Sequence, residues 1–259
     1  MKYLRGPRVE LNFYYADIGE QAALGRLMRA LIELGAEFVG EGLVHVGANA
    51  QKPFGSPYDL PCETMNFTLS DLDILLADPE KRLVEVYFYN AVGLAQKGVA
   101  EEVMFVSISE EAARSDKHPV ALHTDGDAFS YPPEYTDIAR AQEGGKQVYE
   151  RFTMLVKKTR PAYAAITYEY YMKCPMDLRV DSYHYEFNDF FVSEAYLGSA
   201  RIDAVQRLYN GAYVERLGDG IYLSCYEYFN PRGVELRDDD LARGAAMAQI
   251  IASVTSSTD

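Results

Sequence analysis

The stretch VELNFYYADIGEQAALGRLMRALIELGAEFVGEGLVHV, residues 9–46, combines the two periodicities on which a fold prediction rests. Residues 9–15 alternate apolar and polar side chains, as in a strand with one buried face. Between residues 24 and 31 apolar side chains recur at helical spacing, and Gly35 stands where a helix would stop. Residues 38–46 again favour a strand, so the stretch predicts a β-α-β opening.

Beyond this opening, strand and helix patterns continue to alternate. We expect strands at 65–69, 83–89, 103–108, 163–171, 187–192 and 221–229, and helices at 71–76, 138–159, 200–209 and 239–253. Charged residues, Pro and Gly predict a loop across 112–133, which separates two α+β halves, residues 1–130 and 131–259. One continuous domain accommodates the same halves. The expected fold class is α+β, with a mixed or mostly antiparallel sheet and helices packed mainly on one face.

Two segments of the chain share an order of features. Asp17-Ile18-Gly19, a helix, and Gly40-Glu41-Gly42 before a strand are matched by Tyr196-Leu197-Gly198, a helix, and Gly218-Asp219-Gly220 before a strand. This order suggests two related β-α-β units in one sheet. Gly-acid-Gly is also ordinary turn chemistry, so a chance match stays open.

The chain is acidic. Its 259 residues include 39 Asp+Glu against 25 Lys+Arg, which gives a net charge of -14. This charge argues against direct binding of nucleic acid or of an anionic membrane, since both repel carboxylates. It favours a protein partner with a basic surface, and the 48% of hydrophobic residues suffice for a substantial core.

The cysteines and the apolar runs bear on location. Cys62, Cys174 and Cys225 are odd in number and far apart, and neither Cys62 nor Cys225 has a histidine or basic residue beside it in the sequence. Such thiols fit a reducing compartment better than a disulfide framework. Residues 1–7 lack signal-peptide features, and no apolar run reaches the ~18 residues of a membrane span. We therefore expect a cytoplasmic protein.

Tyrosine is concentrated in the second half of the chain. Twelve of the 21 tyrosines lie between Tyr163 and Tyr228, among acidic residues and Phe. Strand propensity accounts for part of this enrichment. The other interpretation is an exposed Tyr and Glu face that binds a partner, because Tyr is enriched at interface hot spots. The candidate partner-binding residues are Tyr226, Glu227, Tyr228, Asp238, Asp239 and Asp240, although the three aspartates also suit a helix N-terminus.

Catalytic motifs are scarce in this sequence. It contains no G-x-S-x-G, H-E-x-x-H or Walker-type motif, so we assign no catalytic residue and no cofactor. His123, Asp125 and Asp127 occupy alternate positions and are the candidates for a divalent metal site. A turn around Gly126 explains the same residues without a metal.

Tyr196-Leu197-Gly198 before a helix and Gly218-Asp219-Gly220-Ile221 before a strand, in an acidic α+β chain, resemble immunity proteins of bacterial polymorphic-toxin systems. The resemblance covers only the last third or so of the chain and transfers no site residue. It implies an inhibitor that occludes a toxin active site, with carboxylates in the places of phosphates.

Two other classes stay open beside the inhibitor. One is an enzyme with a scattered active site, metal-assisted through His123, Asp125 and Asp127. The other is a structural subunit of a phage or secretion assembly. The missing nucleophile motifs favour a non-enzymatic function.

Overall fold

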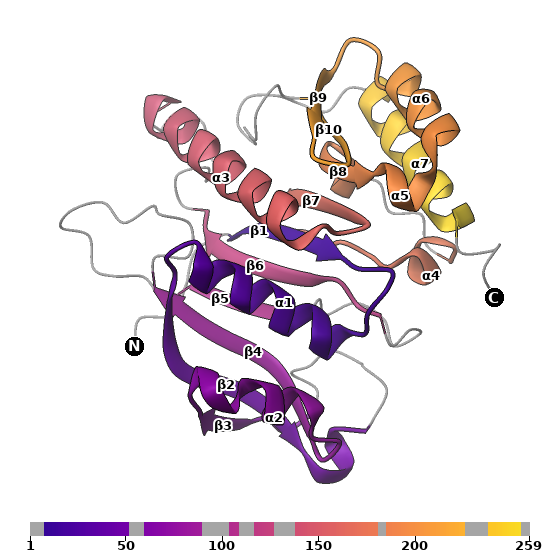
Figure 1. The fold of residues 1–259 in the computed structure, drawn as a ribbon. Helices are drawn as coiled ribbons and strands as arrows, with labels where there is room; N and C mark the ends of the chain where they lie inside the picture. Colours follow the sequence, from indigo (N-terminus) through magenta and orange to yellow (C-terminus); the bar gives the residue numbers. More distant parts are fainter. Residues whose placement is uncertain are drawn as a thin grey trace.

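The computed structural model describes residues 8–51, 60–89, 104–108, 117–126, 138–180, 185–225 and 238–254 (Figure 1). Its strands are β1 (Arg8–Tyr14), β2 (Glu37–Val46), β3 (Glu63–Asn66), β4 (Lys81–Tyr89), β5 (Met104–Ile108), β6 (Val120–Asp125), β7 (Tyr163–Tyr168), β8 (Asp189–Ser193), β9 (Tyr213–Leu217) and β10 (Gly220–Ser224). Its α-helices are α1 (Glu20–Glu33), α2 (Leu72–Ala77), α3 (Ile138–Thr159), α4 (Pro175–Leu178), α5 (Glu194–Leu197), α6 (Ser199–Leu208) and α7 (Asp238–Val254). Short 3-10 turns are η1 (Gly47–Asn49), η3 (Leu69–Asp71) and η6 (Tyr185–Phe187).

All ten strands hydrogen-bond into one sheet, in the order β3-β2-β4-β5-β6-β1-β7-β8-β10-β9. Every neighbouring pair is antiparallel. β1 lies in the interior of the sheet, where Leu11 is opposite Leu122 of β6 and Ile166 of β7. Strands from both halves of the sequence therefore share one sheet, and the α+β class with an antiparallel sheet is confirmed.

The two faces of the sheet are covered by different helices. We call the side that carries Leu11 of β1 the first face and the side that carries Glu10 the second face, because successive strand residues point to opposite sides. α1 and α3 pack on the first face, where Phe152 joins the main core. α6 and α7 pack on the second face over the C-terminal strands, through residues such as Val205 and Met247. The helices are thus divided between both faces rather than packed mainly on one, because β7, β8 and β10 bury apolar side chains on both sides.

The first expected β-α-β unit is β1-α1-β2. In the second, β8 and α6 are followed by β9, where no strand was predicted, and only then by β10, the strand expected to close the unit. The β-α-β units of the structure are therefore β1-α1-β2 and β8-α6-β9. Since neighbouring strands alternate in direction, β1, β2, β8 and β9 all point the same way. The first unit crosses toward the β3 edge with its helix on the first face. The second crosses toward the β9 edge with its helix on the second face. The two crossovers run toward opposite edges of the sheet, and their helices lie on opposite faces. The two crossovers therefore have the same handedness, as expected from the strong handedness preference of such connections.

Two sequence expectations are corrected by the strands. The predicted loop across 112–133 contains β6, which fills the place between β5 and β1. Gly40-Glu41-Gly42 does not precede a strand but forms a bulge within β2, where Gly40 has φ +88°. A Cβ on Gly42 would lie 2.7 Å from the Glu85 carbonyl oxygen, so the bulge brings the two backbones close. By contrast, Gly218-Asp219-Gly220 lies at the turn between β9 and β10.

Candidate functional site

Polar side chains line the second face at the centre of the sheet. Glu10 of β1 is opposite His123 of β6 and Thr167 of β7, so the three side chains point to the same side. Asn12, two residues further along β1, and Ser107 of β5 extend this row. All five side chains are buried. Buried polar groups need partners, and these residues supply them to one another.

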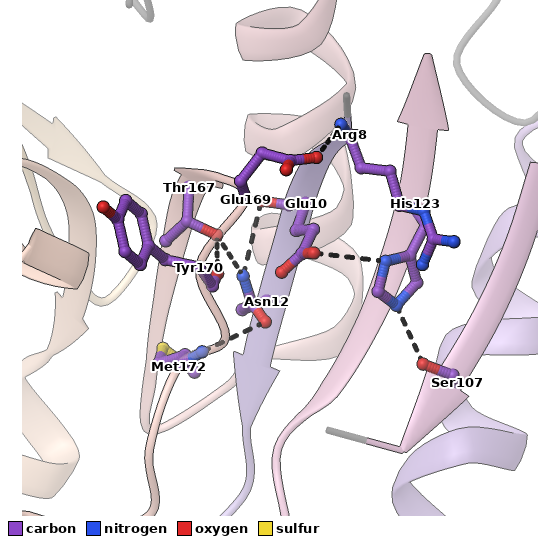
Figure 2. A network of polar contacts seen from close by, with 9 residues as sticks. All are labelled: Arg8, Glu10, Asn12, Ser107, His123, Thr167, Glu169, Tyr170 and Met172. Atoms are coloured by element: carbon purple, nitrogen blue, oxygen red, sulfur yellow. Dashed lines mark hydrogen bonds and ion pairs between the residues drawn. The ribbon is translucent and has the colours of Figure 1, made fainter. Parts of the chain in front are cut away.

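The central part of the network joins a hydroxyl, an imidazole and a carboxylate (Figure 2). Ser107 Oγ lies 2.8 Å from His123 Nε2, and His123 Nδ1 lies 3.5 Å from Glu10 Oε1. The Tyr171 ring meets the imidazole edge-on, with ring centroids 6.1 Å apart. The serine, histidine and carboxylate follow the order of an acyl-transfer relay.

The position of Ser107 opposes that chemistry. Its side chain is only 3% exposed, and it lies inside β5 between Val106 and Ile108. Its backbone belongs to the ladders with β4 and β6. An acyl-transfer site needs a nucleophile that the substrate can reach and N–H donors for the oxyanion. The arrangement therefore acts as internal support in this structure.

A second branch of the network holds the segment after β7. Asn12 Nδ2 donates to Thr167 Oγ1 over 2.9 Å, and Thr167 Oγ1 donates to the Tyr170 carbonyl oxygen. The Met172 N–H is 3.5 Å from Asn12 Oδ1, which accepts from it. The Lys173 N–H donates to Glu186 Oε2 over 2.8 Å. The segment is consequently tied to the sheet at successive backbone groups.

Glu169 turns the chain at the end of β7. Its φ is +61°, a left-handed conformation that costs a non-glycine residue energy unless its surroundings impose it. Glu169 Oε1 accepts from the Arg8 N–H over 2.7 Å, and the Glu169 N–H donates to the Arg8 carbonyl oxygen over 3.0 Å. These two bonds and the Thr167 bond to Tyr170 hold the turn in place.

The turn carries the exposed tyrosine of this region. Tyr170 is 42% exposed, and Figure 2 shows its ring directed away from the network. Met176 and Val180, further along the same segment, are also exposed. Arg179, between them, donates from Nε to the Ala252 carbonyl oxygen over 3.1 Å, which fixes α4 against α7. We call Tyr170, Met176 and Val180 the tyrosine platform.

The predicted partner-binding residues differ in exposure and in position. Asp238 and Asp239 are exposed in the first turn of α7, whereas Asp240 is buried and pairs with Arg243 Nη1 at 2.6 Å. The rise of a helix places Asp238 about 21 Å along α7 from Ala252, the residue that contacts Arg179. Asp238 and Asp239 thus lie at the other end of α7 from that contact. Tyr226, Glu227 and Tyr228 lie outside the described residues.

Two of the three predicted metal ligands, His123 and Asp125, lie on β6. His123 belongs to the network with Glu10 and Ser107. Asp125 ends β6 with its backbone opposite Arg8, and Asp127 lies outside the described residues. Within the described part of the chain, no group of three or more His, Cys, Asp or Glu side chains could hold a metal ion.

Several of the described tyrosines face the interior, which favours strand propensity over an exposed Tyr and Glu face as the reason for their enrichment. Tyr163, Tyr209 and Tyr222 are buried. Tyr222 donates to Asp189 Oδ1 over 2.7 Å, and Tyr209 donates to the Phe187 carbonyl oxygen over 2.8 Å. Because β7, β8 and β10 are covered on both faces, alternation does not give them a solvent side. Tyr170 escapes burial because it follows the strand.

The structure also gives Cys62 a neighbour that the sequence did not indicate. Its Sγ lies 3.6 Å from His45 Nδ1, and that nitrogen lies 3.2 Å from the Pro61 carbonyl oxygen. Burial, with Glu85 nearby, raises the pKa of the Cys62 thiol, while burial lowers the pKa of His45. Both shifts favour the neutral forms, so the pair does not make an activated nucleophile.

The helices also bear on membrane insertion. Of those the structure describes, none combines the length and the apolar character that crossing a bilayer requires.

Comparison with known proteins gives only distant structural similarity. No family model matches the chain, and no curated protein does. Among solved structures, it is similar to the Pseudomonas aeruginosa T6SS protein PA0821, with 10% identity and a TM-score of 0.43. The similarity covers 95% of this chain and 73% of the other.

Proposed function

We propose that this protein is an acidic protein-binding module that inhibits a toxin by covering its active site, as immunity proteins do. The observation that carries the proposal is the tyrosine platform. Tyr170 is exposed, and hydrogen bonds made by Glu169, Thr167 and Asn12 hold the backbone around it in place.

Fixing the ring in advance favours binding. Binding of a partner then does not have to order the Tyr170 loop. Because this entropic cost is avoided, the affinity is higher. Tyrosine adds a large contact area and a hydroxyl, and such residues dominate interface energetics. Met176 and Val180 add exposed apolar side chains further along the same segment. The platform therefore has the composition of an interface centre.

The charge defines the partner. With a net charge of -14, the chain attracts basic proteins over a distance and repels acidic ones. Asp238 and Asp239 contribute exposed carboxylates at the start of α7. A toxin that acts on a nucleic acid presents a basic cleft, where carboxylates replace phosphates. The proposed setting is the cytoplasm of the cell that makes the toxin.

The direct test measures binding to the purified toxin domain encoded by an adjacent gene. The Tyr170→Ala variant is expected to weaken binding by about tenfold or more, the loss typical of an interface hot spot. Val180→Ala on the platform and Val214→Ala on β9 form a matched pair, because both valines are exposed. Only the first is expected to weaken binding. Wild-type protein that neither binds the toxin nor protects cells from it would contradict the proposal.

A second candidate is acyl transfer at Ser107, which the serine, histidine and carboxylate order favours. A fluorophosphonate probe labels activated serines and discriminates between the two functions. Because Ser107 is buried, we expect no labelling at this residue. Labelling of the wild type that disappears in both Ser107→Ala and His123→Ala would establish the enzyme instead.

A further inference from the structure

α2 lies at the β3 end of the sheet (Figure 1), and it and the turn before it carry apolar side chains that are exposed to solvent. Ile74 of α2 is 73% exposed and Leu69 of η3 is 44% exposed. Leu72 and Leu75 point the other way into the main core, so the helix cannot rotate to bury Ile74. Leu69 and Ile74 thus form an outward apolar strip.

Carboxylates surround this strip. Glu63, Asp71, Asp73 and Glu80 are all exposed. Glu63 of β3 is opposite Val44, a core residue of the first face, so its side chain lies on the face that α2 covers. We call Leu69, Ile74, Glu63, Asp71 and Glu80 the α2 surface.

Few of these charges are neutralised. Arg29 pairs with Asp73, and Lys81 pairs with Asp78 at 3.2 Å, so these two cations are already engaged. Within the described part of the chain, Glu63, Asp71 and Glu80 have no ion pair. Glu80 accepts from Gln51 Nε2 over 3.4 Å, which leaves its charge in place. The α2 surface is therefore negative around its apolar strip.

The surface is also held in shape. Thr68 and Asp71 form a capping box, in which the Thr68 N–H donates to Asp71 Oδ2 over 2.9 Å and the Thr68 hydroxyl over 2.6 Å. These bonds hold the pKa of Asp71 below its usual value, so the carboxylate stays charged at neutral pH. A partner would meet a preformed surface.

We propose that the α2 surface docks a cationic protein segment, with an apolar side chain of that segment against Ile74 and Leu69 and its Lys or Arg side chains against Glu63, Asp71 and Glu80. Charge selects this occupant. A second copy of the chain would bring like carboxylates together and add another net charge of -14, whereas a basic segment is complementary. The inference rests on the proposed inhibitor function and adds a second contact surface, separate from the tyrosine platform.

The test uses a synthetic amphipathic helix with Leu on one face and Lys on the other, titrated into labelled full-length protein and followed by NMR. We expect the largest shift changes at the α2 surface. Ile74→Ser is expected to raise the Kd about tenfold, and Glu63→Gln with Glu80→Gln to raise it and flatten its dependence on salt. Shift changes centred elsewhere would overturn the proposal.

Two matched controls sharpen this result. Val214→Ser removes an exposed apolar side chain on β9, and Asp203→Asn removes an exposed charge on α6. Both are expected to leave the Kd within about twofold of the wild type. A peptide with Glu in place of Lys should not bind. If the control variants lost as much affinity for the cationic helix as Ile74→Ser, binding would not depend on the α2 surface, and the proposal would be overturned.

The two proposals fail in different ways. If the toxin domain binds, Tyr170→Ala weakens the complex and Ile74→Ser does not, the inhibitor function stands and docking at the α2 surface is overturned. If no toxin binds while the cationic helix localises to Leu69 and Ile74, the α2 surface stands and the inhibitor function is overturned.

Discussion

The two halves of the sheet bury polar groups in different ways. In the N-terminal half, Glu10 on the second face has the imidazole of His123 as its neighbour, and a third side chain, Ser107, completes the row. In the C-terminal half, the partners of Asp189 of β8 within the described part of the chain are the hydroxyls of Tyr222 and Ser224. The buried carboxylate therefore has an imidazole beside it in the first half and hydroxyl groups beside it in the second.

This difference has a consequence for charge. Burial raises the pKa of Asp189 to about 7, against the smaller lowering effect of its hydrogen bonds from Ser224 and Tyr222. Burial also raises the pKa of Tyr222 far above its ordinary value. The C-terminal half thus keeps its carboxyl neutral over much of the pH range. A buried acid needs a basic neighbour, not just a hydrogen bond, to ionise cheaply.

The largest expected effect is on stability, and it compares apolar packing in the C-terminal half with polar packing in the N-terminal half of the second face. Phe190 of β8 packs against Phe187 and Tyr209, with ring centroids 5.6 Å and 5.1 Å away. Phe190→Ala should lower the free energy of unfolding by about 3–5 kcal/mol through lost burial and the cavity left behind. Ser107→Ala, in the polar part of the same face, should cost about 1 kcal/mol. Urea unfolding measures both, and similar losses would contradict the contrast.

The next effect concerns pH. Since the native pKa of Asp189 lies above that of an unfolded carboxyl, only the native state keeps the proton between about pH 4 and 7. The wild type should therefore lose roughly 2–4 kcal/mol as pH rises through this window, relative to Asp189→Asn. The difference between the two proteins, from urea unfolding at pH 4, 5.5 and 8, isolates this group. A wild type that gains stability relative to the variant would contradict the assignment.

A smaller effect tests the Glu10 and His123 contact directly. A double-mutant cycle of Glu10→Ala and His123→Ala should give a favourable coupling of about 1–3 kcal/mol, because each single change leaves a buried polar group without its partner. The exposed pair of Lys158 and Glu33 is the control, with an expected coupling below about 0.5 kcal/mol. Equal coupling energies in the two pairs would contradict the prediction that the buried pair interacts more strongly than the exposed pair.

The smallest effect lies at the junction of the halves. Arg160 and Glu169 bracket β7, and both have positive φ, +50° and +61°. Arg160→Gly should raise the free energy of unfolding by about 0.5–1 kcal/mol, because glycine is not strained at the end of a helix in this conformation. Glu169→Gly should give no net gain, since it removes the bond from the Arg8 N–H. Thermal unfolding compares the two, and equal gains would show that Glu169 does not support the turn.

Local periodicity predicts much of this fold. α3 spans the expected residues 138–159 despite Gly144 and Gly145, since its other side carries a continuous apolar row with Phe152. β4, β8 and α7 also lie within two residues of their expected ends. β6 is missed because its six residues follow a proline and include His123 and Thr124, so polarity hides a buried strand.

The candidate site depends on information that the sequence does not display. Glu10, Ser107, His123 and Thr167 come from four strands, and only their register brings them to one face. The alternation in residues 9–15 marks Glu10 and Asn12 as polar positions, which by itself predicts a solvent side. The pattern does not show that other parts of the chain bury this face of the sheet. Polar alternation shared by several strands of one sheet is the signal that could have suggested a buried network.

The central position of β1 has a consequence for synthesis. β1 is translated before either of its neighbours, yet Phe13 finds its cross-strand partners only when Val120 and Ala164 have been added. Until then an apolar strand with two open edges accompanies the growing chain, a target for chaperones and a site for intermolecular association. Yield of native protein should therefore respond to elongation rate and chaperone supply more than to the stability of the finished fold.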